Sequence, residues 1–266
     1  GEEDFSMAAL KIIGGAFRII VIFFGISFFM LPVFAASNFA FEDGQGGYTV
    51  TPIRSAAGNQ ELMQSLLLTM QIAFGTVLLT LLLLIPTVAY LHLVIPGARA
   101  WVEFLTLTPL VIPPIVQAVG FLYSMPTWLK STPNSLTFAY VILALPFSYR
   151  ALDAAFATID ARTLYDASRS LGASFSAAIR KVLIPNVATG IYGAIFLTIA
   201  LVLGEFAYAS LLLWDTFPTE LAVAGMANAS TAVALSVLSL LGVWLILIGI
   251  NLFNRKSKTT VVAGAK

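Results

Sequence analysis

The sequence predicts an all-α integral membrane protein with about six transmembrane helices and a cytoplasmic two-helix loop between the fourth and the fifth. Hydrophobic residues make up 59% of the 266 residues and charged residues only 10%, whereas ordinary soluble domains have about 25% charged residues. The hydrophobic residues gather in long runs, and nearly all Lys and Arg residues fall on one side of these runs. A chain of this composition needs a bilayer as its solvent.

Six runs are long enough to span a bilayer, which takes about 20 mostly apolar residues. They cover approximately residues 17–36, 62–91, 102–124, 135–152, 187–213 and 231–253. The fourth run is short and contains Pro146. The second run is long and contains Pro86 near its end, so we expect it to tilt or kink. A second interpretation of the first run is a cleavable signal, because basic residues precede it and it ends Val33-Phe34-Ala35. Its length favours a retained span.

The positive charges orient these spans. With the N-terminus in the cytoplasm, the outer side carries only Arg54 and Lys130. The inner side carries Lys11, Arg18, Arg99, Arg150, Arg162, Arg169, Arg180, Lys181, Arg255, Lys256, Lys258 and Lys266. An even number of spans then places both termini in the cytoplasm, together with the loop at 153–185.

The composition excludes several classes of function. The chain has no cysteine, which removes disulfides and thiolate metal sites. Its net charge of +1 does not indicate the basic surface that a nucleic-acid-binding protein needs. The only histidine, His92, falls at a predicted membrane edge and is expected to be an interfacial polar residue. No phosphate-binding loop or metal-ligand motif occurs, so we expect a chain that is not an enzyme and holds no cofactor.

The cytoplasmic loop is expected to form two short amphipathic helices joined at Gly172. Asp160 and Ser174 are placed to cap them, and Pro185 limits the second helix. Helical spacing puts one set of side chains on a common face in the first helix, namely Leu164, Ala167, Ser168 and Leu171. The second helix repeats that spacing with Phe175, Ala178, Ile179 and Val182. An interfacial helix pair, packed on its own protein or on lipid headgroups, would show the same pattern.

The loop also carries a spaced motif, Asp166-Ala167-Ser168, three residues, Gly172, nine residues and Val182-Leu183-Ile184-Pro185. This motif resembles the EAA loop of permease subunits from type I ATP-binding-cassette (ABC) importers, written roughly Glu-Ala-Ala, three residues, Gly, nine residues and Ile-x-Leu-Pro. The departures are mild: Asp166, Ser168, Val182 and Ile184 replace Glu, Ala, Ile and Leu. Residues 108–116 are similar to the proline-rich third core helix of the polyamine, iron, sulfate and molybdate branches. With Gly204-Glu205-Phe206, the resemblance covers about residues 60–255.

The resemblance implies a single permease domain over residues 1–266, in the inner membrane of a bacterium. The implied partners are an ABC ATPase dimer that binds ATP and Mg²⁺, a second permease subunit, paralogous or identical, and an extracytoplasmic solute-binding protein. The polyamine, ferric iron, phosphonate and small-oxyanion branches are the nearest. The residues expected to couple to the ATPase are Asp166, Ala167, Ser168, Leu171, Gly172, Phe175 and Pro185. Two interpretations remain for three basic residues of the loop, Arg169, Arg180 and Lys181. They pair with acidic groups of the ATPase, or they are ordinary positive charges on the inner side of the membrane.

Glu205 is the one acid well inside a predicted span, where a carboxylate is costly and marks a functional site by default. We expect it to line the translocation pathway with Gln117 and a proline cluster formed by Pro109, Pro113 and Pro114. A structural acid at a subunit interface, and prolines that only kink their helix, are the alternatives. A secondary transporter driven by an ion gradient is the second functional hypothesis, and a membrane scaffold without transport is the third.

Overall fold

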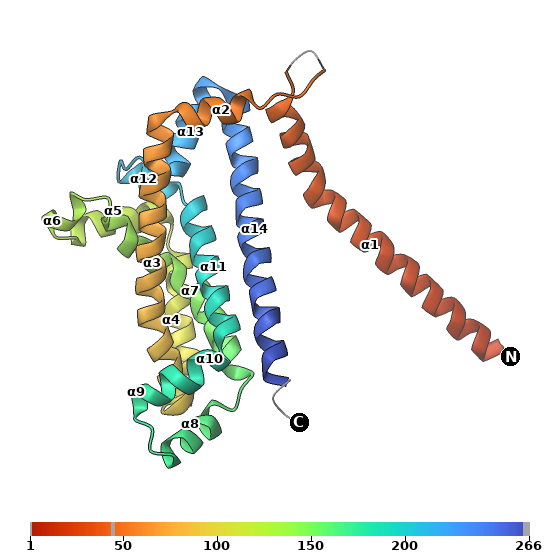
Figure 1. Cartoon of the computed structure of the whole chain (residues 1–266), viewed down its shortest axis with the longest axis vertical. Coiled ribbons are helices and arrows are strands. Elements are labelled where there is room, and N and C mark those ends of the chain that lie inside the picture. The colour runs from red at the N-terminus through yellow and green to blue at the C-terminus, as the bar shows by residue number, and fades with distance from the viewer. Residues whose placement is uncertain (1, 44–45, 263–266) are drawn as a thin grey trace. The chain divides into compact units, whose positions relative to one another are not determined.

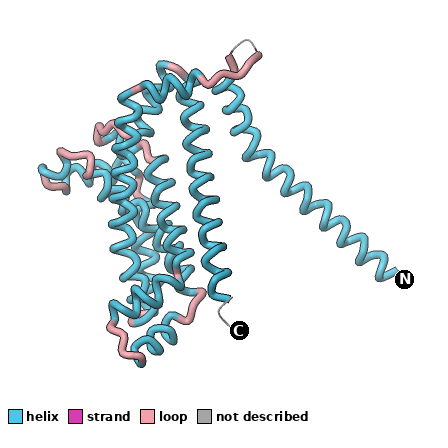
Figure 2. Tube along the Cα trace, viewed as in Figure 1, coloured by secondary structure: helices cyan, strands magenta, loops and turns pink. Residues whose placement is uncertain are grey.

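The computed structural model describes residues 2–43 and 46–262, and every regular element within them is a helix (Figures 1 and 2). The all-α prediction is therefore confirmed. The nearest approach to a strand among these residues is a single antiparallel bridge between Glu42 and Tyr48. One of the expected inner-side charges, Lys266, lies outside the described residues.

The contacts of the chain divide it into two compact units. The first contains residues up to Gly58 together with Val223–Leu241. It holds α1 (Glu2–Phe41), α2 (Thr51–Gly58) and the beginning of α14 (Ala229–Val262). The apolar part of α1, Phe17–Phe41, is long enough to cross a membrane and has no buried residue in its most apolar stretch, as expected for a helix that faces lipid.

The second unit contains the other two continuous helices of membrane-spanning length, α3 (Gln60–Leu93) and α7 (Ser135–Ala157). Asn59 caps α3, because its side chain accepts hydrogen bonds from the backbone N–H groups of Glu61 and Leu62. A third long helix, α11 (Ala188–Gly204), packs against both α3 and α7. These three helices form the frame of the unit.

Two predicted spans are broken rather than continuous. The span expected at 102–124 consists of α4 (Arg99–Val111) and α5 (Pro114–Ser124), and the segments Pro96–Val111 and Pro114–Ser124 meet at 101°. Pro113 removes a backbone donor and forces Ile112 into an extended conformation, with a ψ of 128°. This segment crosses the membrane only if the two halves count as one bent span.

The span expected at 187–213 is interrupted as well. Here α11 ends at Gly204 and the chain resumes as α12 (Ala207–Leu211). On its other side α11 is bent by 78° from the preceding segment, Phe175–Asn186. The described residues thus contain three helices long and apolar enough to cross a membrane, or five if each bent pair is one span. This pattern is typical of a multi-pass membrane protein.

The sixth predicted span coincides with α14. Within it, the described residues Ala229–Leu245 form a continuous apolar stretch.

Two clusters of buried side chains fill the second unit. The loop-side core lies next to the predicted cytoplasmic loop and includes Val88, Leu152, Phe156, Leu183 and Val187. The break-side core lies beside the two helix breaks and includes Ile72, Ala118, Tyr140, Val202 and Tyr208.

Candidate functional site

The predicted cytoplasmic loop folds as two short helices, α8 (Ala161–Ser170) and α9 (Phe175–Ala178), joined at Gly172. Gly172 has a φ of +86°, which favours glycine, so the predicted joint is confirmed. Asp160 caps α8, since its carboxylate accepts from the Thr163 backbone N–H at 3.1 Å and from the Thr163 hydroxyl at 2.7 Å. These bonds, the hydroxyl first, hold the pKa of Asp160 below its ordinary value.

α9 is also capped as expected, because the Ser174 hydroxyl accepts from the Ala177 backbone N–H at 3.2 Å. The chain continues from α9 through a π-helical turn, Ile179–Leu183, to Pro185 and α10 (Ile184–Asn186). α7 extends to Ala157, so Asp153, the first residue of the predicted loop, lies on the last turns of this helix. A polar residue at a helix end can remain helical when it finds partners there, as Asp153 does.

The loop turns part of its predicted apolar face outward. Ser168 is buried, but Ala167 is exposed and Leu171 is 89% exposed. The common face ends early because α8 stops at Ser170, which leaves Leu171 beyond the helix. Phe175 is 43% exposed, and its ring packs edge-on against Tyr165 at 5.9 Å.

The other side of the loop is fixed to the body of the second unit. Ala178, Ile179 and Leu183 are buried, and the last two belong to the loop-side core. Arg169 stabilises the turn from within, because its guanidinium donates to the Ala173 carbonyl oxygen at 2.7 Å. Asp166, the acidic residue of the motif, is exposed.

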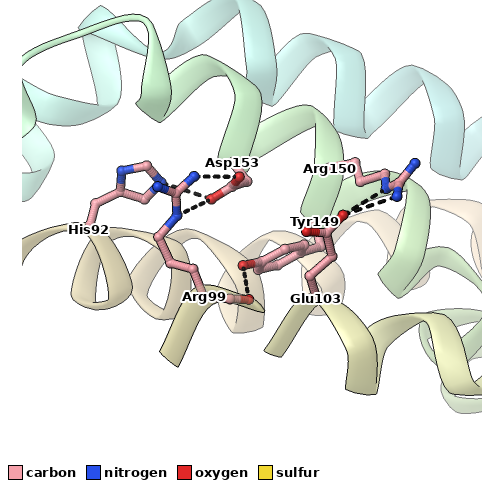
Figure 3. Close-up of polar contacts among 6 residues, drawn as sticks. All are labelled: His92, Arg99, Glu103, Tyr149, Arg150 and Asp153. Carbon is pink, nitrogen blue, oxygen red and sulfur yellow. Dashed lines mark hydrogen bonds and ion pairs between the residues drawn. The ribbon is translucent and has the colours of Figure 1, made fainter. Parts of the chain in front are cut away.

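A cluster of ion pairs ties three helices together next to the loop-side core (Figure 3). Asp153 of α7 accepts from Arg99 at 3.0 and 2.8 Å and contacts His92 Nε2 at 2.8 Å. The Tyr149 hydroxyl donates to the Arg99 carbonyl oxygen at 3.3 Å. Sequence reasoning missed this cluster, although three polar residues at predicted membrane edges on one side were a signal for it.

A second ion pair lies beside the cluster, between Arg150 and Glu103 at 3.0 Å. Both side chains are largely exposed, at 64% and 40%. It joins α7 to α4, but its exposure makes it the weaker of the two links.

The predicted pathway residues meet at the two helix breaks. The Gln117 side-chain amide donates to the carbonyl oxygens of Pro109 at 2.5 Å and Ile112 at 2.7 Å. The amide oxygen accepts from the Tyr208 hydroxyl at 2.7 Å. Pro113 and Pro114 lie at the break itself and are exposed. Gln117 thus satisfies the end of α4 where prolines have removed the helical donors.

Glu205 was predicted to lie well inside a continuous span. It lies instead in the break between α11 and α12. Both of its carboxylate oxygens lie 3.1 Å from the backbone N–H of Tyr208 and accept from it. The Tyr140 hydroxyl is buried and forms no hydrogen bond with the described residues. The break could not be predicted from the apolar run, because hydropathy carries no information on the direction of the backbone.

Tyr208 connects Gln117 to Glu205 and was not singled out from the sequence. Its position three residues after an acid, where a side chain can cap a following backbone N–H, was the available signal. The described residues contain no group of three or more His, Asp or Glu placed to hold a metal ion. Comparison of the sequence with protein-family models and with curated proteins gives no match.

Proposed function

We propose that this chain is a permease subunit of a type I ABC importer in the inner membrane of a bacterium, with both termini in the cytoplasm. It forms half of the translocation pathway, and a second permease forms the other half. A separate ATPase dimer binds ATP and Mg²⁺, and an extracytoplasmic binding protein delivers and selects a small solute. The observation that carries the proposal is the two-helix loop with the EAA-like spacing, capped at both helices, hinged at Gly172, and exposing Leu171 and Phe175.

The two sides of the loop suit a mechanical link. The exposed side offers a leucine, a phenylalanine and the small Ala167. A few side chains that become buried on binding usually carry most of the energy of a protein interface. The inner side is packed into the loop-side core through Leu183 and Val187. A force applied to the exposed side would therefore reach α3, α7 and α11 without bending the loop away from them.

The cycle follows from this link. Closure of the two ATPases on ATP draws the two loops together, and the helix frame passes the movement to the broken spans. The pathway residues Glu205 and Gln117, with Pro109, Pro113 and Pro114, line the place where the spans are broken and can move. Hydrolysis restores the first state. This is alternating access, in which ATP binding biases a two-state element.

Leu171→Glu tests the proposal, because it places a charge on the exposed side of the loop while the residue makes no core contact. We expect the full-length variant to lose its copurifying ATPase and to keep its helix content by circular dichroism. Leu213→Glu is the matched control, since Leu213 is 87% exposed and follows α12. The control should retain the ATPase. Retention by Leu171→Glu as well would contradict the proposal.

One observation favours a secondary transporter as the second candidate. The partly exposed carboxylate of Glu205 has no Lys or Arg partner among the described residues, and an embedded acid of this kind can bind a coupling cation. Under this hypothesis, uptake follows an imposed ion gradient without ATP. It would also be abolished by Glu205→Gln and unaffected by Leu171→Glu.

A further inference from the structure

The two broken spans are tied to each other through one side chain, Gln117 of α5. Its amide N–H groups serve the first break, at the carbonyl oxygens of Pro109 and Ile112. Its amide oxygen serves the second break, where it accepts from the Tyr208 hydroxyl of α12 at 2.7 Å. Segments that lie 91 residues apart in sequence thus share one amide group.

The contact with Tyr208 is suited to repeated opening. Tyr208 is 2% exposed, and its ring packs edge-on against Tyr140 at 6.4 Å, so the ring keeps its position in the break-side core. Gln117 and Glu205 are only partly buried, so water can replace a lost partner. A single neutral hydrogen bond contributes only about 0.5–1.5 kcal/mol net. The hydrogen bond therefore has a specific geometry, and breaking it takes little free energy.

The other hydrogen bonds at the two breaks are internal to each of them. The Gln117 amide binds carbonyl oxygens of its own bent span, and Glu205 binds the backbone of the segment that follows it. These bonds hold the shape of each break. Among the described residues, the bond between Gln117 and Tyr208 is the only hydrogen bond that joins one break to the other. The remaining contacts between α5 and α12 are apolar packing in the break-side core, so loss of the bond loosens the two broken spans without unfolding either of them.

We infer that Tyr208 is a positioning residue and that its hydrogen bond to Gln117 is a latch between the two broken spans, closed at rest and opened during transport. The latch itself follows from the geometry. Its opening in transport rests on the proposed function. Removing the hydroxyl leaves the ring in the core and shifts the equilibrium toward the open arrangement by the free energy of one hydrogen bond.

The absence of cysteine makes the latch measurable in the full-length protein. Ala118→Cys places one thiol on α5 beside Gln117, at a fully buried position. We expect Tyr208→Phe to raise the rate at which a small water-soluble maleimide labels this thiol by about twofold to thirteenfold, the factor that one hydrogen bond corresponds to. An unchanged rate overturns the latch.

Two controls separate opening from general loosening. Tyr123→Phe removes the same hydroxyl from a tyrosine of α5 that is 88% exposed and should leave the rate unchanged. Ser148→Cys reports from a fully buried position of α7, away from the breaks, and should show no response to Tyr208→Phe. A rise at both thiols shows unfolding, in which case Gln117→Met, which removes the same bond from the other side, decides the question.

Labelling with and without ATP tests whether the latch opens during transport. In a complex that hydrolyses ATP, ATP should raise the labelling of Ala118→Cys, and Tyr208→Phe should reduce the size of that response because the latch is already open. An ATP-hydrolysing complex whose labelling does not respond to ATP overturns the role in transport. Failure to copurify any ATPase counts instead against the proposed function, and the comparison without nucleotide still decides the latch.

Discussion

Gly190 determines how closely α11 can approach α7. A Cβ atom at this position would lie 2.7 Å from the Ala151 carbonyl oxygen and would overlap the Ala155 side chain. Both obstacles are on the facing helix, and one of them is backbone, so neither can move without displacing α7. The absence of a side chain at Gly190 therefore permits the close approach of α11 to α7.

Gly190→Ala should destabilise the protein by about 1–3 kcal/mol, the usual cost of an extra methyl group in a packed core. Thermal unfolding in detergent measures the effect. Gly193→Ala is the matched control on the same helix, because a Cβ there would lie 3.6 Å from the Ala151 Cβ, an ordinary contact. Equal melting temperatures for the two variants would show that α7 and α11 can separate freely.

Within the elements, the sequence was most informative where structure depends on neighbouring residues. The caps at Asp160 and Ser174 and the joint at Gly172 were predictable because each acts within about four residues. The long helices α3 and α7 were predictable because each is one unbroken apolar run. Local patterns of this kind are readable from sequence alone.

The breaks and their contacts were less predictable because they depend on tertiary structure. The prolines near residue 113 predicted that backbone hydrogen bonds are lost there, but they did not predict a bend of 101°. The bond between Gln117 and Tyr208 joins residues on different elements, and no periodicity reports such a pair. For the same reason Asp153 was assigned to a loop, although its partners His92 and Arg99 hold it on a helix.

At the level of elements, Asp153 joins α3, α4 and α7, so Asp153→Asn should cost more than the loss of the exposed pair. We expect a loss of about 1.5–3 kcal/mol, typical of hydrogen bonds to charged groups. Glu103→Gln, which breaks the largely exposed pair with Arg150, should cost about 0–1 kcal/mol. Thermal unfolding of the two variants gives the comparison. A smaller effect for Asp153→Asn would mean that the helices are held together by apolar packing alone.

At the scale of the whole molecule, the second unit has two distinct ends. The loop helices α8 and α9 lie at one end, and the connection after α12 lies at the other, with α3 running between them (Figure 1). If this unit crosses the membrane as proposed, the two ends face opposite aqueous compartments. The excess of Lys and Arg on the side of the loop would then place the loop in the cytoplasm, as proposed.

Single thiols at the two ends test this orientation, with no background labelling from native cysteine. Ser176→Cys, exposed on α9, should react with an impermeant maleimide only after the membrane is opened. Leu213→Cys, which is 87% exposed, should react in intact cells. The reverse result would invert the topology, and labelling of both from one side would mean that the second unit does not cross the bilayer.

The break between α4 and α5 also has a consequence for biogenesis. These helices have 13 and 11 residues, so they are about 20 and 17 Å long, against a hydrocarbon core of about 30 Å. Neither half can enter lipid as an independent span, because the polar backbone at the break would be exposed there. Gln117 belongs to the same segment as the carbonyl groups that it satisfies. The nascent chain therefore carries its own means of neutralising the break, before α11 and α12 have been synthesised.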